Sequence, residues 1–375
     1  MRAILRLTEL SARGFRNLAP DPIFFESGTT ILLGENAQGK TNLLEAVALL
    51  CGQRSFRQAR PAEMTRSAEG FSIAGVVKRG FETDALAVTW SAEGGRSFFL
   101  GEKPASFREA SRRAPAVFLA PEHRELLAGP PAVRRRFLDR LVLALYPAAG
   151  DDLARYHTAL RSRNALLSRD RGRSAAPEEM EAWTEELVLA GSAVRRYRRE
   201  ALSEWRVFFV GLAEAAGPEY LSVSVGYVSD ADSEEELREA FHRLAAAERR
   251  RGYCLAGPHR DDLAFTREGR PLSSQASAGE AHRIVFLIKL AEWNAVKAAA
   301  GEAPLFCMDD FDAGLSESSA EALFDALPEA GTVILTGASR PERWRRKGSH
   351  VREMRAGQVS PSPISAPLPR LAVND

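Results

Sequence analysis

The sequence has few of the residues that hold disulfide-rich or metal-bound domains together. It contains only 3 cysteines in 375 residues, and Cys51, Cys254 and Cys307 lie far apart in the chain. Their spacing predicts neither a zinc site nor a disulfide framework. A chain of this length can bury a sizeable core without such cross-links.

Long hydrophobic runs are also missing. No apolar stretch approaches the roughly 20 residues that a helix needs to cross a bilayer. Residues 4–9 alternate apolar and charged side chains, which is not the pattern of a secretion signal. With 45% hydrophobic and 27% charged residues, the composition is typical of a globular protein. We therefore expect a cytoplasmic protein without a membrane partner.

The chain lacks an excess of either charge. It has 51 basic and 50 acidic residues, for a net charge of +1. This balance argues against a surface that binds any polyanion, so contacts to nucleic acid would depend on local patches. No basic stripe interleaved with aromatic residues occurs, and we do not expect recognition of single strands by base stacking.

Strand-like and helical segments alternate on both sides of a helical block. Between Arg134 and Leu212, apolar residues recur at helical spacing, with a polar break at residues 169–179. Alternation of strands and helices predicts a mostly parallel α/β sheet, and the block reads as an inserted helical lobe. The boundaries that we predict are residues 1–133 and 216–357 for the two parts of the α/β domain, 134–215 for the lobe and 358–375 for a flexible tail.

Phosphate binding is predicted by one segment near the N-terminus. Residues 34–41 match G-x4-G-K-[ST] between an apolar strand and an amphipathic helix. The backbone N–H groups of such a loop point at phosphate oxygens, its lysine neutralises the β- and γ-phosphates, and its threonine hydroxyl binds Mg²⁺. A glycine-rich turn that only caps a core helix is the alternative, and the order strand, loop, helix favours the P-loop. We predict an ATP site that includes Gly34, Glu35, Asn36, Ala37, Gln38, Gly39, Lys40, Thr41 and Asn42.

An acidic pair follows a second apolar strand. Residues 305–308 suit a central parallel strand, which ends at Asp309 and Asp310. Because ligands of open α/β sheets bind at the carboxyl ends of strands, these acids are placed to act on the nucleotide. We predict that Asp309 binds Mg²⁺ through water beside Thr41, and that Asp310 polarises the attacking water, with Lys40 as the other catalytic residue. A simple helix cap is the alternative role of the pair.

A third segment, residues 277–280, precedes an amphipathic helix and is called the signature here. Ser277 at the N-cap and Gly279 without a side chain would let phosphate approach the helix N-terminus. An ordinary capping sequence explains the pattern equally well. The order of P-loop, signature and acidic strand is that of ABC-type ATPases, which favours the nucleotide-binding interpretation.

These segments, with several others, resemble the RecF family, whose ATPase head is related to those of SMC proteins. The resemblance spans nearly the whole chain. It rests on residues 13–18 (RGFRNL), 34–46, 54–57 (RSFR), 118–122 (FLAPE), 129–131 (GPP), 134–139 (RRRFLD), 156, 163–167 (RNALL) and 257–263 (GPHRDDL). Generic P-loop proteins lack the later strings, so the resemblance is specific.

The resemblance implies an ABC-type P-loop ATPase head, with a mixed sheet and helices, and an inserted helical arm lobe. It also implies a recombination mediator that uses ATP and Mg²⁺, forms an ATP-dependent homodimer, and binds double-stranded DNA and junctions of single and double strands. Such a protein hydrolyses ATP slowly and, with RecR and RecO, helps load RecA at gaps. Ser277 and Gly279 of one subunit would complete the ATP site of the other.

Two segments depart from the family pattern. The signature normally reads Ser-Gln-Gly-Gln in the family, whereas here it is Ser277-Ala278-Gly279-Glu280. A loop that normally ends in Glu-Leu-Asp here reads Gly314-Leu315-Ser316. The loss of that aspartate puts turnover in doubt more than ATP binding. It leaves open a diverged ATP-binding interaction module with little turnover, whereas a transporter subunit is disfavoured by the absence of membrane-coupling sequence. The polar residue that the family has after its last strand is assigned to Thr336.

Arginine clusters supply the candidates for DNA contact. Arg54, Arg57 and Arg60 follow the P-loop helix, on an edge that in related heads faces the DNA. The run 195–199 adds Arg195, Arg196, Arg198 and Arg199, which cannot all lie on one side of a helix. Two further clusters occur at 134–136 and 249–251. A solvated helix face paired with nearby glutamates is the alternative for these runs.

Overall fold

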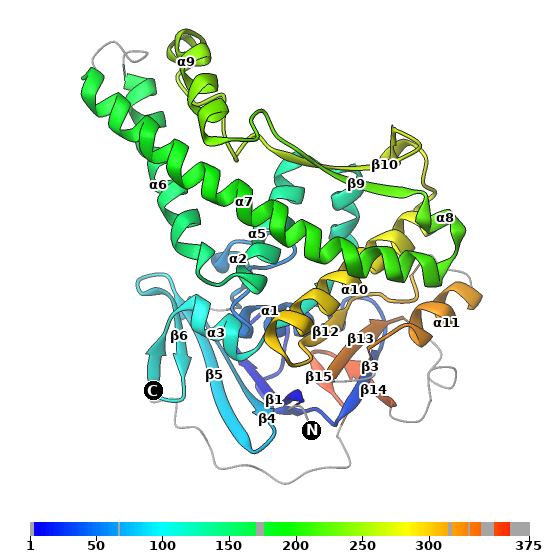
Figure 1. The fold of residues 1–375 in the computed structure, drawn as a ribbon. Coiled ribbons are helices and arrows are strands. Elements are labelled where there is room, and N and C mark those ends of the chain that lie inside the picture. Colours follow the sequence, from blue (N-terminus) through cyan, green and yellow to red (C-terminus); the bar gives the residue numbers. More distant parts are fainter. Residues whose placement is uncertain are drawn as a thin grey trace. The chain divides into compact units, whose positions relative to one another are not determined.

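The computed structural model describes residues 4–66, 68–169, 176–313, 317–328, 331–338 and 349–360. The chain forms two compact units, whose elements are labelled in Figure 1. Unit 1 comprises Met1–His123 and Val296–Asp375, and unit 2 comprises Arg124–Ala295.

Unit 1 contains a six-stranded sheet in which five neighbouring strands are parallel. Its order is β15-β14-β3-β13-β12-β8, and only β15 runs antiparallel to its neighbour. The strands are β3 (Gly28–Leu33), β8 (Ala116–Leu119), β12 (Leu305–Met308), β13 (Thr332–Gly337), β14 (Ser349–Arg355) and β15 (Gln358–Val359). This sheet agrees with the predicted parallel arrangement, and its strands β3, β13 and β12 are buried as central parallel strands require.

A second sheet of unit 1 is antiparallel throughout, with the order β2-β1-β4-β5-β6-β7. Its strands are β1 (Leu5–Arg13), β2 (Ile23–Phe24), β4 (Phe71–Arg79), β5 (Glu82–Ser91), β6 (Gly95–Leu100) and β7 (Lys103–Ala105). The remaining helices of this unit are α1 (Lys40–Leu50), α2 (Pro61–Met64), α3 (Phe107–Arg113) and α11 (Glu317–Asp325).

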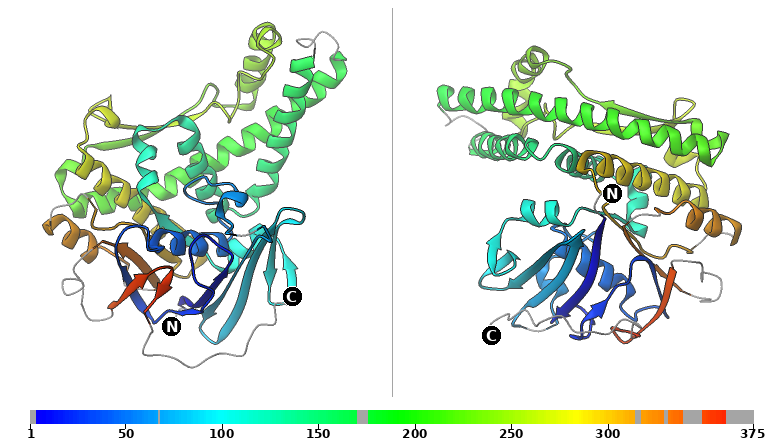
Figure 2. Two further views of the ribbon diagram at one scale, coloured as in Figure 1. Left: turned by 180° about the vertical axis from the view of Figure 1, so that it is seen from behind. Right: turned by 60° about the horizontal axis from the view of Figure 1, so that its bottom comes forward.

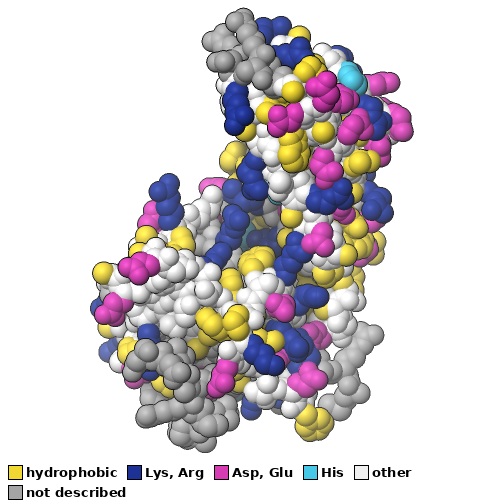
Figure 3. Space-filling model, turned by 90° about the vertical axis from the view of Figure 1, so that its left-hand side faces the viewer, with side chains coloured by type: hydrophobic (Ala, Val, Ile, Leu, Met, Phe, Trp, Pro, Cys, Tyr) yellow, Lys and Arg dark blue, Asp and Glu magenta, His cyan; other side chains and the backbone are white. Residues whose placement is uncertain are grey.

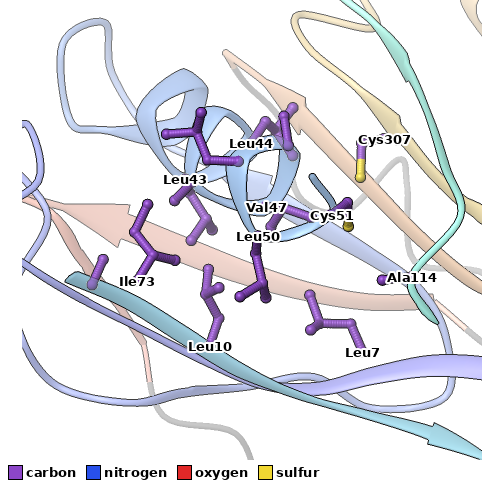
Figure 4. Close-up of a cluster of buried hydrophobic side chains, with 14 of the residues drawn as sticks. Leu7, Leu10, Leu43, Leu44, Val47, Leu50, Cys51, Ile73, Ala114 and Cys307 are labelled. Carbon is purple, nitrogen blue, oxygen red and sulfur yellow. The ribbon is translucent and has the colours of Figure 1, made fainter. Parts of the chain in front are cut away.

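Helix α1 forms the centre of the core of unit 1. It contacts β4 and β5 of the antiparallel sheet and β13 of the parallel sheet, so it lies between the two sheets (Figure 2). Leu43, Val47 and Leu50 point from α1 into a cluster that includes Leu7 and Ile73 (Figure 4). Each such buried side chain contributes about 1.5–3 kcal/mol to folding. The core therefore fixes the helix whose N-terminus carries the P-loop.

The cysteines pack as small apolar side chains. All three are free and buried. Burial raises the pKa of Cys51 to about 12, so its thiol stays protonated. Cys51 and Cys307 belong to the core of unit 1, which gives them a packing role.

Unit 2 is mainly helical and adds a small antiparallel sheet in the order β11-β10-β9. Helix α7 (Pro177–Ala216) is 40 residues long and packs against α6 (Ala149–Ser168) (Figure 1). It begins with proline at the first helical position and is followed by Gly217, whose φ of 136° suits glycine. The other elements are α4 (Glu125–Ala128), α5 (Pro131–Leu145), α8 (Pro218–Leu221), β9 (Val223–Val228), α9 (Glu234–Arg251), β10 (Asp262–Arg267), β11 (Arg270–Pro271) and α10 (Ala278–Ala300), which continues across the unit boundary.

The predicted helical lobe is only part of unit 2. We predicted that it ends at residue 215, whereas the compact unit extends to Ala295. Side chains of α7 explain the difference: Trp205 Nε1 donates to the carbonyl of Ile288 on α10 at 3.1 Å, and Arg198 Nη1 donates to the carbonyl of Pro258 at 2.7 Å. The predicted tail also begins with structure, because Gln358 and Val359 form β15.

A buried carboxylate, that of Asp261, joins several segments of unit 2. Arg195 binds both of its oxygens, at 3.0 and 2.7 Å, and Tyr227 donates its hydroxyl to it. Arg198 lies 3.7 Å from the same carboxylate and 2.7 Å from Asp139. Because Asp261 is only 2% exposed and both guanidinium groups are buried, these charges depend on one another.

We expect that Asp261→Asn destabilises unit 2 by about 3–5 kcal/mol, because it removes the buried negative charge that Arg195 and Arg198 share. Urea unfolding, followed through the fluorescence of Trp183, Trp205 and Trp293 in this unit, measures the effect. Arg196→Gln, at an exposed position of the same arginine run, is the control and should change stability by less than about 0.5 kcal/mol. Equal unfolding midpoints for the two variants would refute the role of Asp261.

Candidate nucleotide-binding site

The P-loop connects β3 to α1 and has left-handed backbone at Ala37 (φ 66°) and Gly39 (φ 111°). Such turns aim successive N–H groups at one point and form an anion-binding concavity. A Cβ at Gly39 would lie 2.8 Å from Asn17 Oδ1, and one at Gly34 would lie 2.4 Å from the carbonyl oxygen of Met354. Both glycines of the motif are therefore needed for close packing of the loop.

Lys40 is the first residue of α1, and its side chain returns over the loop. Its Nζ donates to the carbonyl oxygens of Gly34 at 2.6 Å and Glu35 at 2.9 Å. The residue is only 5% exposed. The fold therefore places a positive charge inside the concavity where the β- and γ-phosphates of a nucleotide would lie.

A hairpin close to the C-terminal end of unit 1 braces the P-loop. The N–H of Gly357 donates to the carbonyl of Gln38 at 2.8 Å, and the N–H of Ala356 donates to Gln38 Oε1 at 2.6 Å. The carbonyl of Gly357 accepts from Ala19 at 3.0 Å. Sequence reasoning did not find this contact, because no local pattern links residues more than 300 positions apart.

The strings RGFRNL and RSFR, singled out by resemblance, meet at Glu45 of α1. This fully buried carboxylate accepts from Arg16 Nε at 2.9 Å and from the Ser55 hydroxyl, and Arg57 lies 3.9 Å away. Arg57 also donates to Asn42 Oδ1 at 2.8 Å. The ion pair and hydrogen bonds fix the segment after α1 relative to the P-loop helix.

The acidic end of β12 meets the P-loop helix through two threonines. Thr41 Oγ1 donates to Asp309 Oδ1 at 3.1 Å, and the Thr336 hydroxyl donates to the same oxygen. Thr336 also accepts from the N–H of Asp310 at 2.9 Å. Strand β13 lies between β3 and β12, so its Thr336 fills the space between the loop and the acid. Thr336 is thus a site residue, although it lies within the strand and not after it.

The donors at this place suit magnesium. Burial raises the pKa of Asp309, and the hydrogen bonds from Thr336 and Thr41 oppose that rise. The nearby oxygens of Thr41 and Asp309 are hard ligands, which Mg²⁺ prefers together with water and phosphate oxygens. In the described ranges no group of three or more His, Cys, Asp and Glu side chains could hold a metal by itself. A metal here would depend on the nucleotide as well as on the protein.

Asp310 and Asp312 add two carboxylates beside the loop. Asp310 has an unusual backbone φ of 48° and is half-buried. Burial raises the pKa of Asp312, the charge of Asp310 raises it further, and that of Lys40 lowers it. Sequence reasoning missed Asp312. The run of three acids within residues 309–312 was the signal that could have identified it.

The signature lies in unit 2, at the start of α10. Ser277 is exposed, and its Oγ accepts from the N–H of Glu280 at 3.3 Å. Its carbonyl accepts from Ala281 at 2.8 Å. The predicted capping is therefore present, and Gly279 lies in the first turn of the helix. The loop that departs from the family pattern, Gly314-Leu315-Ser316, lies outside the described residues.

The arginines predicted to touch DNA from the run 195–199 need correction. Arg195 and Arg198 are 2% and 3% exposed and form ion pairs with Asp261 and Asp139 of unit 2, so they cannot reach a phosphate. Arg199 binds Asp232 at 2.5 Å. Only Arg196 is exposed, and it lies over the ring of Tyr197. Because neighbouring residues of a helix face different directions, two of these four arginines lie in the interior.

The cluster 249–251 forms the last turn of α9. Three glutamates occupy the first turn of this helix, so opposite charges match the two ends of its dipole. On the face drawn in Figure 3, basic side chains are interleaved with acidic ones. A structural role at the helix end therefore explains this cluster.

The candidates of unit 1 are at the surface. Arg54, Arg57 and Arg60 are exposed in the segment that follows α1. Partial burial lowers the pKa of Arg96, on β6, and the nearby positive charge of Arg54 lowers it further. This segment and Arg96 form a basic surface that the sequence indicated only in part.

We expect that Thr336→Val weakens magnesium-dependent ATP binding about tenfold, because it removes a hydrogen bond that orients Asp309. Titration of a fluorescent ATP analogue with magnesium, and again with EDTA, measures the difference. Thr30→Val on β3 is the matched control, since among the described residues the buried Thr30 hydroxyl has no hydrogen-bond partner. Equal loss in the presence of EDTA would show a general defect of the fold.

The chain is similar to known proteins along nearly its whole length. No protein-family model matches the chain. The DNA replication and repair protein RecF of Anaeromyxobacter sp. (strain Fw109-5) is 33% identical over 373 residues, covering 95% of this chain and 99% of the relative. RecF of Synechococcus sp. (strain JA-3-3Ab) is 32% identical over 370 residues, covering 94% and 97%.

Solved structures give the same fold. The recombination mediator protein RecF with ATP, of the RecFOR pathway, superposes with a TM-score of 0.87 at 23% identity, covering 96% of this chain and 98% of that one. An Smc head domain of Pyrococcus furiosus reaches a TM-score of 0.52 at 15% identity, with 95% of each chain covered. The fold is thus that of an SMC-like ATPase head. With relatives above 30% identity along nearly its whole length, the chain belongs to the family of the DNA replication and repair protein RecF.

Proposed function

We propose that this chain is an ATP-dependent DNA-binding protein of recombinational repair and replication. Two copies close on shared nucleotides, hold duplex DNA or a junction of single and double strands, and release the DNA after slow hydrolysis. In the cytoplasm, the dimer acts with RecR and RecO and helps to load RecA at gaps in DNA. The observation that supports this proposal best is the joint placement of Lys40, Thr41 and Asp309 at one end of the parallel sheet.

The residues divide the work on ATP. The P-loop N–H groups and Lys40 bind the phosphates. Thr41, with Asp309 acting through water, would hold magnesium, whose charge would offset that of the phosphates. Asp310, beside Asp309, accepts a hydrogen bond from the attacking water and orients it. Asp312 adds a further carboxylate next to Asp310.

The second half of each site comes from a partner copy. Ser277 is exposed and Gly279 has no side chain, so the start of α10 can approach a phosphate that another subunit presents. ATP is then part of the interface between the two copies. This arrangement couples nucleotide binding to dimerisation without any further switch.

DNA contact is assigned to the basic surface of unit 1. Arg54 and Arg60 are exposed, and Arg57 joins this segment to Asn42 at the start of the P-loop helix. With a net charge of only +1, one copy offers few such contacts, so two copies must combine them. Binding is therefore expected to need ATP and to weaken steeply with salt. None of the helices in the described part of the chain has the length and hydropathy to cross a bilayer.

We expect that Lys40→Met abolishes ATP-induced dimerisation and tight duplex binding, because the phosphates lose their main positive partner. Analytical ultracentrifugation with and without ATP and a gapped duplex measures both. Persistence of the dimer on DNA in this variant would refute the mechanism.

Mixing two inactive variants tests whether the site is shared. Ser277→Arg should block the signature but leave the P-loop intact, whereas Lys40→Met does the reverse. In an equimolar mixture, mixed dimers therefore contain one site in which an intact P-loop meets an intact signature. Partial recovery of ATPase activity is expected from the mixture and from neither variant alone. Ser273→Arg, at an exposed position before the signature, is the control that should keep activity. A mixture without recovery would show that each copy holds its nucleotide alone.

A related ATP-binding module with little turnover is the second candidate, since Ser316 replaces the aspartate of the family loop. Single-turnover phosphate release with duplex DNA separates the two functions. We expect DNA-stimulated release in the wild type and its loss in Asp310→Asn, with ATP-dependent dimerisation kept. A flat trace from the wild type would favour the module.

A further inference from the structure

The signature helix carries an acid where a nucleotide would approach. Glu280 lies in the first turn of α10, three residues after Ser277. A carboxylate there interacts well with the helix dipole. It would nevertheless repel a triphosphate held by the partner copy, because like charges at short range oppose each other. Some group must offset this charge if the signature is to bind ATP.

Arg267, the last residue of β10, is the partner of Glu280. Its Nη2 lies 2.6 Å from Glu280 Oε1, and the two side chains are only 17% and 18% exposed. The same Nη2 lies 3.4 Å from the carbonyl oxygen of Glu219. The pair is therefore less exposed to water than a surface salt bridge, and the Glu219 carbonyl also binds the Arg267 guanidinium.

The backbone of Arg267 also binds Gln275, five residues before Glu280. Its carbonyl oxygen accepts from Gln275 Nε2 at 3.1 Å. The N–H of Glu280 in turn donates to Ser277 Oγ. One residue thus binds both ends of the segment 275–280, and Ser277 and Gly279 lie between the two attachments.

Other charged groups face this cluster and balance it. The pKa of Tyr220 is raised first by burial, and Arg283, Glu219, Glu280 and Arg267 all act on it. The guanidinium of Arg283 lies 5.8 Å from the centre of the Tyr220 ring. Two arginines and two glutamates thus lie near Tyr220, and removal of Arg267 would leave one positive charge beside two negative ones.

We propose that Arg267 is a positioning residue of the shared ATP site. It neutralises Glu280 and fixes segment 275–280, so that Ser277 and Gly279 can meet the phosphates of the partner's nucleotide. This role rests on the proposed function, and it explains how a signature that ends in glutamate can still serve it.

A double-mutant cycle tests the role through ATP-dependent dimerisation of the full chain. Arg267→Gln should weaken dimerisation about tenfold, since it leaves an uncompensated acid facing the triphosphate. Glu280→Gln alone should weaken it little, and Arg267→Gln/Glu280→Gln should recover most of the loss. Arg267→Lys, which keeps the charge, should lie close to the wild type. Binding of a fluorescent ATP analogue to the monomer should stay unchanged in all four variants, because the P-loop is intact.

Arg270→Gln, at an exposed position on β11, is the control and should behave as the wild type. Two results would overturn the proposal: dimerisation of Arg267→Gln at wild-type strength, or a loss that Glu280→Gln does not restore. Failure of the wild type itself to dimerise with ATP would instead overturn the proposed function, and this inference with it.

Discussion

The hydrogen bonds to the buried carboxylate of Asp309 join the parts of unit 1 on which nucleotide chemistry depends. Thr41 at the start of α1 and Thr336 on β13 donate to the same oxygen, so three elements that are distant in sequence converge on one atom. A carboxylate that is 3% exposed needs such donors, because burial opposes its ionisation. The two threonines therefore serve the fold and the site together. Any cation that binds here enters an arrangement of oxygens that the protein has already prepared.

The parts of the candidate site that have a local signature could be predicted from the sequence. The P-loop pattern fixes Gly34, Gly39 and Lys40 within eight residues, and an apolar strand followed by Asp309 has a simple geometric meaning in a parallel sheet. The resemblance to RecF was confirmed along nearly the whole chain. Two features could not be predicted from the sequence: the hairpin that contacts Gln38, and the position of Thr336 between the P-loop and Asp309. Both depend on which strands become neighbours in the sheet.

The arginine run 195–199 shows why charge patterns in sequence mislead. Four arginines in five residues indicated a basic surface, yet Arg195 and Arg198 face inward to Asp261 and Asp139. Their partners lie about sixty residues away in either direction, so no helical-spacing rule reveals them. The surface that remains exposed, around Arg54 and Arg57, is smaller and adjoins the P-loop helix. Part of the positive charge of this chain therefore stabilises its interior.

The strand order of the parallel sheet has a consequence for biosynthesis. Strand β3 leads into the P-loop, and both of its neighbours, β13 and β14, are made some 300 residues later. While the chain emerges from the ribosome, β3 thus has neither lateral hydrogen-bond partner, and closing such a long loop is slow. The nascent polypeptide cannot hold ATP in its final geometry until β13 and β14 have been made. Until then its apolar strand is a natural client for chaperones.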